Sequence, residues 1–360
     1  MIFFNYPKSI YLKYKNEINK SIDKVLKSGV YVKSTELKNF ETSFAKYIGS
    51  KFASGVGNAT DAIYISLKTI GIKKNDEVIT VSHTATGTAM AILNTGAKIV
   101  FCDINKNNFN IDLSLLEKKI NINTKAIVVV HIYGQSCNMN DLLKISKKYN
   151  LPIIEDCSQS AGGMYDNKKL GSFGLFGCFS FFPTKNLSCI GDGGMITCNK
   201  LSFKKNIDSM REYGWNSDRD AITVGINSRL DEIQASILNV KLKYLDKDNL
   251  ERRQIANFYD SKIINKKIIK PQENFLSYHV YHLYVIKVAN RDKLIKELNK
   301  KNIFPGIHYK KAIHQQKIFS NHKHKLPSTN NVVKLILSLP IYPGLSKKDL
   351  AIIINIINKF

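Results

Sequence analysis

Apolar positions recur at two different spacings along this chain. In residues 8–29 and 34–49 they fall three to four apart, which places them on one face of a helix. Short apolar runs then alternate with polar turns or helical patterns, at 77–81, 98–104, 125–134, 151–156 and 178–182. Runs such as 126–130 are apolar on both faces, as a strand covered by helices must be. This alternation predicts an α/β fold with a mostly parallel sheet.

The pattern changes in the last third of the chain. From Arg229 to about Ile264 it is helical without a clear interruption. Beyond this stretch, residues 278–288 are typical of a strand and residues 292–303 of a helix. We therefore predict a large domain over residues 1–245 and a small C-terminal α+β domain over residues 246–360.

The composition is that of a folded protein without membrane segments. The chain has 360 residues, of which 44% are hydrophobic, enough to bury a large core. No run approaches the roughly 20 apolar residues that a membrane helix needs. The first residues carry neither a basic region nor a small-residue cleavage site, so we predict no signal peptide and a cytoplasmic protein.

The net charge of +25, from 54 Lys+Arg against 29 Asp+Glu, raises the question of nucleic acid. The lysines are scattered along the whole length, and no basic block is interleaved with aromatic residues. We therefore predict no nucleic-acid partner. A non-catalytic, basic nucleotide- or nucleic-acid-binding protein stays as an alternative whose support is the net charge. The same charge would help to attract an anionic substrate.

The cysteines and histidines do not indicate a metal site. None of the six cysteines forms a C-x-x-C pair, which favours reduced and mostly buried thiols. His322 and His324 flank Lys323 on one short basic segment, without further ligands nearby. We expect them to be solvated and predict no metal.

The first candidate for chemistry is Lys185, within SFFPTKNLSCIGDGG at 180–194. It follows an apolar strand and a proline and precedes a glycine-rich turn. A lysine at the edge of a buried strand is partly desolvated, which lowers its pKa and makes the amine a nucleophile. Imine formation with an aldehyde cofactor requires such an amine. Taken alone the signal is weak, because the chain is rich in lysines.

A second candidate is Asp156, at the carboxyl end of the apolar run in LPIIEDCSQSAGG (151–163). Ligands of open parallel sheets bind outside these strand ends. A helix cap is the competing interpretation. With pyridoxal phosphate, the carboxylate would keep the pyridine nitrogen protonated, so that the ring accepts electrons. Gln159 would then bond the phenolic oxygen of the ring.

Two further segments follow predicted strands. In GVGNATDAIYISLKTIG (55–71), a glycine-rich turn enters a helix at Ala59 or Thr60, where free N–H groups and the helix dipole attract an anion. A plain helix start with a threonine cap is the alternative. In VSHTATGTAMAI (81–92), His83 would lie flat against a cofactor ring, or be structural. Together these segments supply a lysine, an acid, a stacking group and a phosphate cradle.

These segments and others resemble the DegT/DnrJ/EryC1/StrS family of sugar aminotransferases. The resemblance runs from about residue 30 to 310 and rests on GNATDA, SHTAT, HIYGQ, EDCSQSAGG, FSFFPTKNL with GDGG, GINSRLDEIQA, and HVYHLYVI with GIHY. It implies pyridoxal-phosphate transferase fold type I, like aspartate aminotransferase. In this fold a large, mostly parallel sheet of the seven-stranded type is covered by helices, and a smaller C-terminal α+β domain follows. It also implies a homodimer with shared active sites.

The resemblance also assigns roles to residues. Lys185 would bind pyridoxal phosphate covalently, Asp156 would pair with the pyridine nitrogen, and Gln159 would meet the phenolic oxygen. His83 would face the ring. The phosphate would be held by Ala59, Thr60 and Ser180, with Asn227 arriving from the partner subunit. The sugar site would be lined by Phe182, His308 and Tyr309.

Some members of this fold are dehydratases with a histidine in place of the lysine, so Lys185 indicates transamination. Two positions depart from many relatives. Phe182 stands where they have Tyr or His, and His83 where they have a carbon-rich aromatic side chain. The histidine in SHTA and the REYGWN segment resemble the branch that acts on dTDP-3-keto-6-deoxyhexoses.

The resemblance therefore predicts amino transfer from L-glutamate to a nucleotide-linked keto sugar. The cofactor would alternate between pyridoxal and pyridoxamine phosphate. The products would be 2-oxoglutarate and a dTDP-3-amino-3,6-dideoxyhexose. A 4-keto-6-deoxyhexose stays an alternative substrate, and the nucleotide and the sugar stereochemistry stay open.

Overall fold

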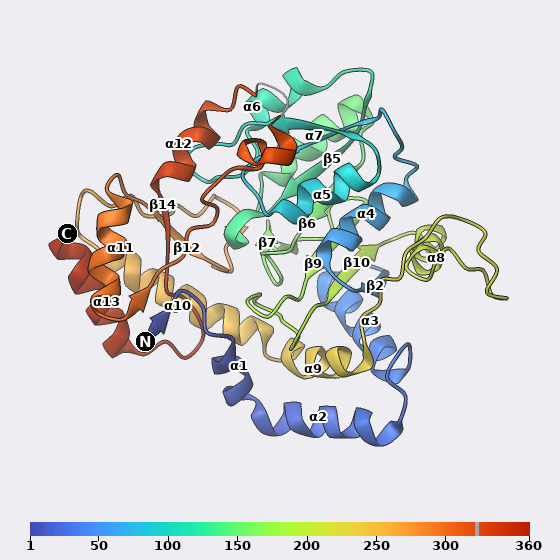
Figure 1. Ribbon diagram of the computed structural model, residues 1–360, viewed down its shortest axis with the longest axis horizontal. Helices are drawn as coiled ribbons and strands as arrows, with labels where there is room; N and C mark the ends of the chain where they lie inside the picture. Colours follow the sequence, from blue (N-terminus) through green and yellow to red (C-terminus); the bar gives the residue numbers. More distant parts are fainter. Residues whose placement is uncertain (321–323) are drawn as a thin grey trace.

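A seven-stranded sheet with strand order β2-β10-β9-β6-β5-β3-β4 forms the centre of the molecule (Figure 1). This computed structural model describes residues 1–320 and 324–360. The strands are β2 (Phe52–Val56), β3 (Glu77–Val81), β4 (Lys98–Cys102), β5 (Thr124–Val130), β6 (Ile153–Asp156), β9 (Phe176–Ser180) and β10 (Gly194–Cys198). Only β10 runs antiparallel to its neighbours. The predicted α/β fold with a mostly parallel sheet is confirmed.

Helices cover both faces of this sheet. One face packs against α4 (Ala59–Thr69), α5 (Thr86–Asn94) and α8 (Leu201–Met210). The other packs against α3 (Thr35–Ile48), α7 (Met139–Tyr149) and α9 (Glu232–Leu242). In β5, Ala126 and Val128 belong to the first core, whereas Ile127 and Val129 belong to the second. Because successive side chains point to opposite faces, residues 126–130 of this strand must all be apolar.

Two helices that the sequence predicts as continuous are each interrupted. The first divides into α1 (Pro7–Lys13) and α2 (Lys15–Ser28), and the later stretch divides into α9 and α10 (Leu245–Lys262). Tyr14 and Tyr244 stand at the breaks, and their rings stack at a centroid distance of 4.1 Å. The Tyr14 hydroxyl also donates to Asp248 at 2.9 Å. The breaks pack against each other, which periodicity within one helix does not reveal.

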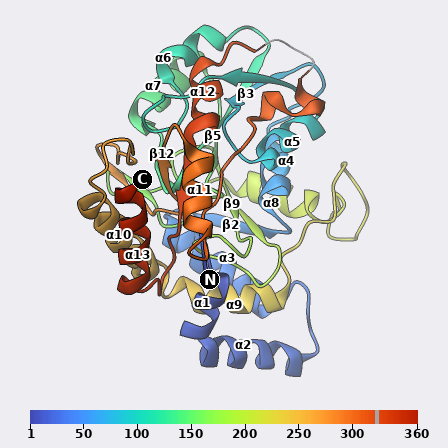
Figure 2. The same cartoon turned by 60° about the vertical axis from the view of Figure 1, so that its left-hand side comes forward.

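The C-terminal part consists of α10 and the elements after it, and most of these elements share a core of their own. These elements are β11 (Ser277–Tyr278), β12 (Tyr284–Lys287), α11 (Arg291–Asn299), β13 (Ile303–Phe304), α12 (Pro327–Leu335), β14 (Ile336–Leu339) and α13 (Lys347–Lys359). β12 pairs antiparallel with β14. At the other end of the chain, β1 (Ile2–Phe3) pairs parallel with β13, so both termini lie in this part (Figure 2). The domain boundary at residue 245 stays a prediction.

The remaining elements are short. The hairpin β7 (Met164–Tyr165) and β8 (Lys168–Lys169) pairs with β11. α6 covers Leu113–Leu116, and single 3-10 turns cover Glu117–Lys119, Ile132–Gly134, Ile313–Gln315 and Lys317–Phe319. The segment between α8 and α9 leaves the body of the molecule as an arm (Figure 1).

The expectations on cysteines, membranes and histidines have mixed outcomes. All six cysteines are buried and none forms a disulfide, as predicted. Over the described residues, no helix combines the length and the apolar character that a membrane crossing requires. His322 and Lys323 lie outside the described residues. The expectation for His324 was wrong, because its ring packs against Phe101 at a centroid distance of 5.1 Å and is only partly exposed.

Candidate active site

Consecutive parallel strands bring most of the predicted site residues to one edge of the sheet. Asp156 is the last residue of β6, and Ser180 is the last residue of β9. His83 and Tyr133 lie shortly after β3 and β5. The four strands are neighbours in the sheet and run in the same direction. Their carboxyl ends therefore meet, and open α/β sheets bind ligands at such an edge.

Lys185 lies in the loop that follows β9, beside this edge. Its backbone N–H donates to the carbonyl of Phe182 at 2.8 Å and closes a turn around Pro183. Burial lowers the pKa of the Lys185 ammonium group to about 8, and the negative charge of Asp156 partly offsets this effect. At pH 7 roughly one tenth of such an amine is neutral. The side chain is thus available as a nucleophile without a separate base.

Side chains from distant parts of the chain hold the loop on both sides of Lys185. The Asn5 amide donates to the carbonyl of Thr184 at 2.7 Å. The Asn186 amide donates to the Asn249 side chain at 2.7 Å and to the carbonyl of Val280 at 3.0 Å. The N-terminal segment, α10 and the segment before β12 therefore all fix the position of the lysine.

Asp156 is almost completely buried, yet it has several donors. One carboxylate oxygen accepts from the Thr88 hydroxyl at 2.7 Å. The other accepts from the hydroxyl and the backbone N–H of Ser158, at 2.5 and 3.1 Å. These hydrogen bonds fix the orientation of the carboxylate. Asp156 does not cap a helix, since no helix begins after β6 before the β7–β8 hairpin.

The start of α4 has the features of an anion site. Asn58 is the N-cap, because its side-chain oxygen accepts from the N–H of Asp61 at 2.8 Å. The helix therefore begins at Ala59, as predicted, and the threonine-cap alternative is wrong. The N–H groups of Ala59 and Thr60 have no acceptor within the helix, and the helix dipole adds positive potential there. This end of α4 thus favours a phosphate group.

Sheet register places Ser180 beside this helix start. Gly194 of β10 pairs with Ser180 on one side and with Val56 on the other. A Cβ at Gly194 would lie 2.5 Å from the carbonyl carbon of Asn58 and 3.0 Å from the nitrogen of Ala59. Only glycine therefore allows β10 to approach the helix so closely. Ser180 and Ala59 are brought to the same place although 120 residues separate them in the chain.

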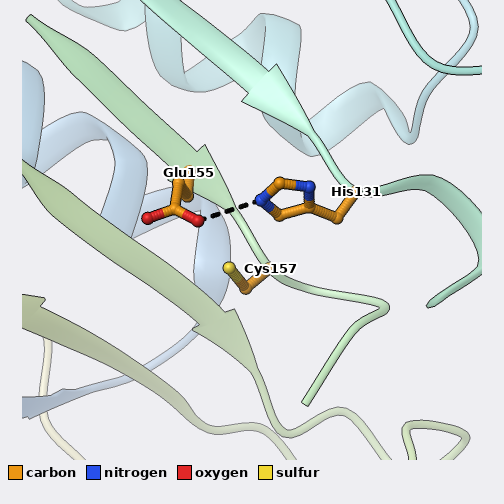
Figure 3. A group of neighbouring side chains, drawn as sticks. All are labelled: His131, Glu155 and Cys157. Carbon is orange, nitrogen blue, oxygen red and sulfur yellow. Dashed lines mark hydrogen bonds and ion pairs between the residues drawn. The ribbon is translucent and has the colours of Figure 1, made fainter. Parts of the chain in front are cut away.

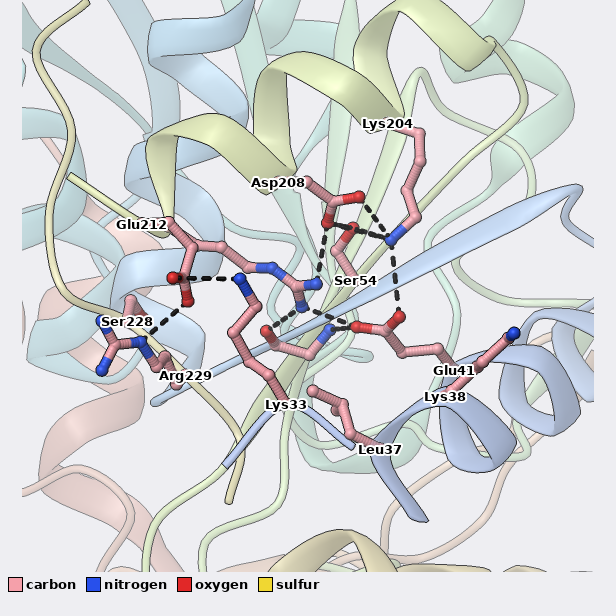
Figure 4. A network of polar contacts seen from close by, with 12 residues as sticks. Lys33, Leu37, Lys38, Glu41, Ser54, Lys204, Asp208, Glu212, Ser228 and Arg229 are labelled. Atoms are coloured by element: carbon pink, nitrogen blue, oxygen red, sulfur yellow. Dashed lines mark hydrogen bonds and ion pairs between the residues drawn. The ribbon is translucent and has the colours of Figure 1, made fainter. Parts of the chain in front are cut away.

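A network of charged side chains around the buried Arg211 holds the strand that leads into α4 (Figure 4). Arg211 donates to Glu41 and to the carbonyl of Gly55, both at 2.6 Å. The N–H of Gly55 donates to the same Glu41 oxygen at 2.8 Å. Lys204 adds hydrogen bonds to Ser54 and Asp208, each at 2.9 Å. The end of β2 is thus clamped between α3 and α8.

Asn227 stands at the end of the arm and is exposed. Its neighbour Ser228 is buried and reaches the start of α4 in the same chain. The Ser228 hydroxyl accepts from the N–H of Gly57 at 2.9 Å and donates to Asp61 at 2.6 Å. The contribution of Asn227 to a partner's site stays a prediction, because one chain is described.

His83 is completely buried. Its Nε2 lies 2.6 Å from the hydroxyl of Tyr133, and its Nδ1 has no hydrogen-bond partner among the residues that the structure describes. Burial lowers the pKa of His83 to about 4. The ring is therefore neutral at pH 7. Its predicted contact with a cofactor ring stays a prediction.

Gln159 is buried and uses both ends of its amide within the protein. Its oxygen accepts from the N–H of Tyr133 at 2.7 Å, and its NH₂ group donates to the Tyr309 hydroxyl at 2.8 Å. The predicted bond to a phenolic oxygen of the cofactor would use the second hydrogen of this NH₂ group. Tyr309 is thereby placed beside the predicted cofactor residues.

The other two predicted sugar-site residues differ in exposure. The Nδ1 of His308 lies 2.9 Å from the hydroxyl of Ser338, and burial together with the charge of Lys185 lowers the pKa of His308 to about 4. Phe182 is 48% exposed and presents an apolar ring at the mouth of the Lys185 loop. The site therefore combines a neutral imidazole, a phenol and an exposed ring around the amine.

His131, Glu155 and Cys157 form a buried group (Figure 3), in which Glu155 and Cys157 are the sequence neighbours of Asp156. Their arrangement fits hydrogen bonding better than a metal. The Nδ1 of His131 accepts from the N–H of Cys137 at 3.1 Å, so Nε2 carries the proton and donates to Glu155 at 3.0 Å. Glu155 also accepts from three backbone N–H groups at 2.7–2.8 Å, those of Gly171, Phe173 and Gly174. Both partners are already saturated.

Replacing Glu155 by glutamine is expected to lower the free energy of unfolding by at least about 2 kcal/mol. The amide NH₂ group would face backbone N–H donors, and a buried donor without an acceptor is costly. Chemical denaturation measures the loss. Glu117→Gln, which removes an exposed pair with Lys148, should change stability by less than about 0.5 kcal/mol. Equal stabilities of the two variants would contradict this account of the Glu155 cage.

The residues at this edge fit pyridoxal phosphate on structural grounds. Lys185 offers an amine of lowered pKa, and Asp156 offers a buried carboxylate. Gly194 lets β10 and Ser180 lie against the start of α4, because any Cβ at this position would strike Asn58. The buried Nδ1 of His83 has no hydrogen-bond partner in the described part of the chain. An amine, an acid and an anion-binding helix start are the groups that an aldehyde, a pyridine nitrogen and a phosphate require.

Three supporting residues were not predicted from the sequence. Ser158 lies two positions after Asp156. At this spacing an aspartate side chain often accepts a hydrogen bond from the backbone N–H, so this contact could have been predicted from the sequence. Thr88 lies in α5, and Tyr133 lies in the HIYGQ segment without an assigned role. Nothing in the local pattern pairs these two with Asp156 or His83.

Comparisons with known proteins identify the family of this chain. The model of the DegT/DnrJ/EryC1/StrS aminotransferase family matches residues 13–358. The dTDP-3-amino-3,6-dideoxy-alpha-D-galactopyranose transaminase of Aneurinibacillus thermoaerophilus is 40% identical over 361 residues, covering 100% of this chain and 99% of the relative.

Two crystal structures have the same fold. DesV of S. venezuelae is 32% identical with a TM-score of 0.97, over 99% of this chain and 98% of the other. NtdA from Bacillus subtilis, with bound cofactor PMP, is 27% identical with a TM-score of 0.90, over 96% of this chain and 81% of the other.

Proposed function

The chain belongs to the DegT/DnrJ/EryC1/StrS aminotransferase family, and we propose that it aminates the third carbon of a dTDP-linked 3-keto-6-deoxyhexose with L-glutamate as donor. It has pyridoxal-phosphate transferase fold type I and is a pyridoxal-phosphate-dependent sugar nucleotide aminotransferase. The alternative of a non-catalytic basic binding protein is therefore wrong. The cytoplasmic location stays a prediction.

The observation that carries the proposal is Lys185 beside Asp156 at the carboxyl edge of the sheet. Burial lowers the pKa of the amine to about 8, and Asp156 is the carboxylate whose charge acts on it. In our assignment Ala59, Thr60 and Ser180 hold the phosphate, Asp156 pairs with the pyridine nitrogen, and Gln159 meets the phenolic oxygen. These residues lie at or shortly after the ends of two strands, β6 and β9, and at the start of α4.

When bound, pyridoxal phosphate supplies a reactive aldehyde carbon and an electron-accepting ring. Asp156 would pair with the pyridine nitrogen, and hydrogen bonds from Thr88 and Ser158 fix the position of its carboxylate. The Nζ of Lys185 takes the proton from the α-carbon of the amino donor, and later returns a proton to the sugar carbon. Positioned proton transfer of this kind is worth about 10²- to 10⁴-fold in rate.

The proposal of a 3-keto-6-deoxyhexose draws on the relative from Aneurinibacillus thermoaerophilus, which is named for a 3-amino-3,6-dideoxy sugar. His308, Tyr309 and Phe182 would contact the sugar, and the exposed ring of Phe182 suits an apolar edge such as a deoxy methyl group. A 4-keto-6-deoxyhexose is the alternative substrate. The same three residues would then contact the sugar ring in a different orientation.

We also propose a homodimer. The arm between α8 and α9 exposes Tyr213, Ile222 and Val224, which are 41%, 68% and 77% exposed. Val30 and Tyr31, in the segment before α3, are 48% exposed each. Apolar side chains grouped in this way are typical of an interface. An arm that carries Asn227 at its base would then reach the site of the second copy.

The visible absorption spectrum tests the function. The purified protein with pyridoxal phosphate should absorb as an imine, and L-glutamate should bleach this absorbance. A dTDP-linked 3-keto-6-deoxyhexose should restore it, whereas the 4-keto isomer should not. Recovery with the 4-keto isomer alone would replace the proposed substrate by the alternative. A protein that never shows the absorbance would overturn the assignment of Lys185.

A further inference from the structure

Tyr133 occupies an unusual position between the large sheet and the C-terminal part. Its backbone has a φ of +60°, in the left-handed region that a bulky residue seldom adopts. Such conformations persist where the surroundings hold them, and they concentrate at functional sites. Its side chain is 3% exposed. None of the roles assigned above uses this residue.

Three hydrogen bonds hold Tyr133. Its N–H donates to the side-chain oxygen of Gln159 at 2.7 Å. Its hydroxyl donates to the backbone carbonyl of His308 and lies 2.6 Å from the Nε2 of His83. The three partners come from three separate segments, two of them at strand ends and one in the GIHY segment.

The hydrogen-bond donors and acceptors of this group determine which ring nitrogen of His83 carries the proton. A carbonyl oxygen has no proton, so the single hydroxyl proton of Tyr133 must lie toward His308. The hydroxyl oxygen can then only accept from His83. Nε2 of His83 therefore carries the ring proton, and Nδ1 is left with its lone pair.

Together with the chain itself, the hydrogen bonds of Tyr133 and Gln159 also form a closed ring. Tyr133 joins Gln159 through its N–H, Gln159 joins Tyr309 through its NH₂ group, and Tyr133 joins His308 through its hydroxyl. His308 and Tyr309 are consecutive residues. The GIHY segment is thus hydrogen-bonded to the large domain at two points. The backbone of His308 bonds to Tyr133, and the side chain of Tyr309 bonds to Gln159, which is itself a partner of Tyr133.

We propose that Tyr133 is a positioning residue: its hydroxyl holds His83 as the Nε2–H tautomer and fastens the His308–Tyr309 segment of the sugar site to the cofactor side. The kinetic consequence rests on the proposed function, whereas the tautomer does not. Tyr133 touches neither substrate nor reacting atoms in this assignment. It acts through His83, Gln159 and His308.

Tyr133→Phe removes the hydroxyl and keeps the ring. Without the acceptor, His83 should lose its preference for the Nε2–H tautomer. The His308 carbonyl loses its donor, so the sugar-site segment should loosen. We expect the KM for the sugar nucleotide to rise about three- to tenfold, the range that one hydrogen bond supports. The KM for L-glutamate and the rate of bleaching by it should change less than twofold.

Tyr259→Phe is the matched control. Tyr259 is also completely buried, and its hydroxyl also donates to a backbone carbonyl, that of Pro340 at 2.8 Å. It belongs to the core of the C-terminal part, away from the sheet edge. A general loss of stability from a missing buried hydroxyl would appear in both variants. A change of tautomer or of the sugar KM should appear in Tyr133→Phe alone.

The experiment records ¹⁵N spectra of histidine-labelled full chain, with and without bound pyridoxal phosphate. His83 is assigned from the signals that His83→Asn removes. In the wild type we expect a protonated Nε2 and an unprotonated Nδ1, and in Tyr133→Phe averaged shifts. An Nδ1–H tautomer in the wild type would overturn the proposal. So would an unchanged tautomer and an unchanged sugar KM in Tyr133→Phe.

The two proposals fail in different ways. If the protein never transaminates a keto sugar, the proposed function fails, while the ¹⁵N spectra still decide the tautomer. If it transaminates and Tyr133→Phe behaves like Tyr259→Phe in both measurements, the role of Tyr133 fails and the function stands.

Discussion

Lys185→Ala is expected to lose the imine absorbance with pyridoxal phosphate and to transaminate at least about 10⁴-fold more slowly than the wild type. The variant lacks both the nucleophile that binds the aldehyde and the base that moves the proton. Lys185 lies in a loop held by Asn5 and Asn186, so the substitution leaves the fold in place. Absorption spectra and the rate of glutamate-dependent amination of the keto sugar measure the effect.

A second buried lysine provides the control for this variant. Burial also lowers the pKa of Lys241 to about 8, but this amine donates to the carbonyl of Ser188 at 2.7 Å and is not acted on by Asp156. Lys241→Met should keep the absorbance and stay within a few-fold of wild-type turnover. If Lys185→Ala turned over at the wild-type rate, or if Lys241→Met lost the absorbance instead, the assignment of the cofactor lysine would be wrong.

Asp156→Asn is expected to slow turnover by roughly 10²- to 10³-fold, the cost of removing one preorganised electrostatic contact from an active site. A neutral amide cannot hold a proton on the pyridine nitrogen, so the ring accepts electrons less readily. Asparagine can still accept from Ser158, and thus the loop should keep its course. The spectrum should still show an imine, because Lys185 is intact. Single-turnover bleaching with L-glutamate isolates the slow step.

Asp103→Asn is the matched control for this second variant. Asp103 is also buried and accepts from Ser328 and Thr329, at 2.6–2.9 Å, but it lies outside the site. It should lower stability without slowing the bleaching reaction more than a few-fold. A wild-type rate for Asp156→Asn would show that Asp156 only supports the fold.

Positions that depend on near neighbours in the chain could be predicted from the sequence. Residues 126–130 of β5 are all apolar because this part of the strand is covered on both faces, and this is visible in the residues themselves. Asp156 and Lys185 were recognisable for the same reason, since Asp156 ends such a strand and Lys185 lies in the loop after another. The start of α4 was predicted at Ala59 or Thr60, and it lies at Ala59 with Asn58 as its cap.

Interactions between distant segments could not be predicted in this way. The breaks at Tyr14 and Tyr244 depend on one ring stacking on the other across 230 residues. The approach of Gly194 to Asn58 depends on an antiparallel strand entering an otherwise parallel sheet. Neither feature produces a periodic pattern in the sequence, because each of these residues would be equally compatible with its own helix or strand without the contact.

The same distinction holds for the chemistry of the site. The residue types and their places at strand ends follow from the linear sequence, because desolvation and strand direction are local properties. Which hydrogen bonds those residues make was decided by tertiary structure. His83, Tyr133 and His308 are far apart in the chain. The hydroxyl of Tyr133 can bond to both histidines only after packing has brought the three residues together. A buried polar group takes whichever partner the fold places within reach, so its partner is a property of the whole chain.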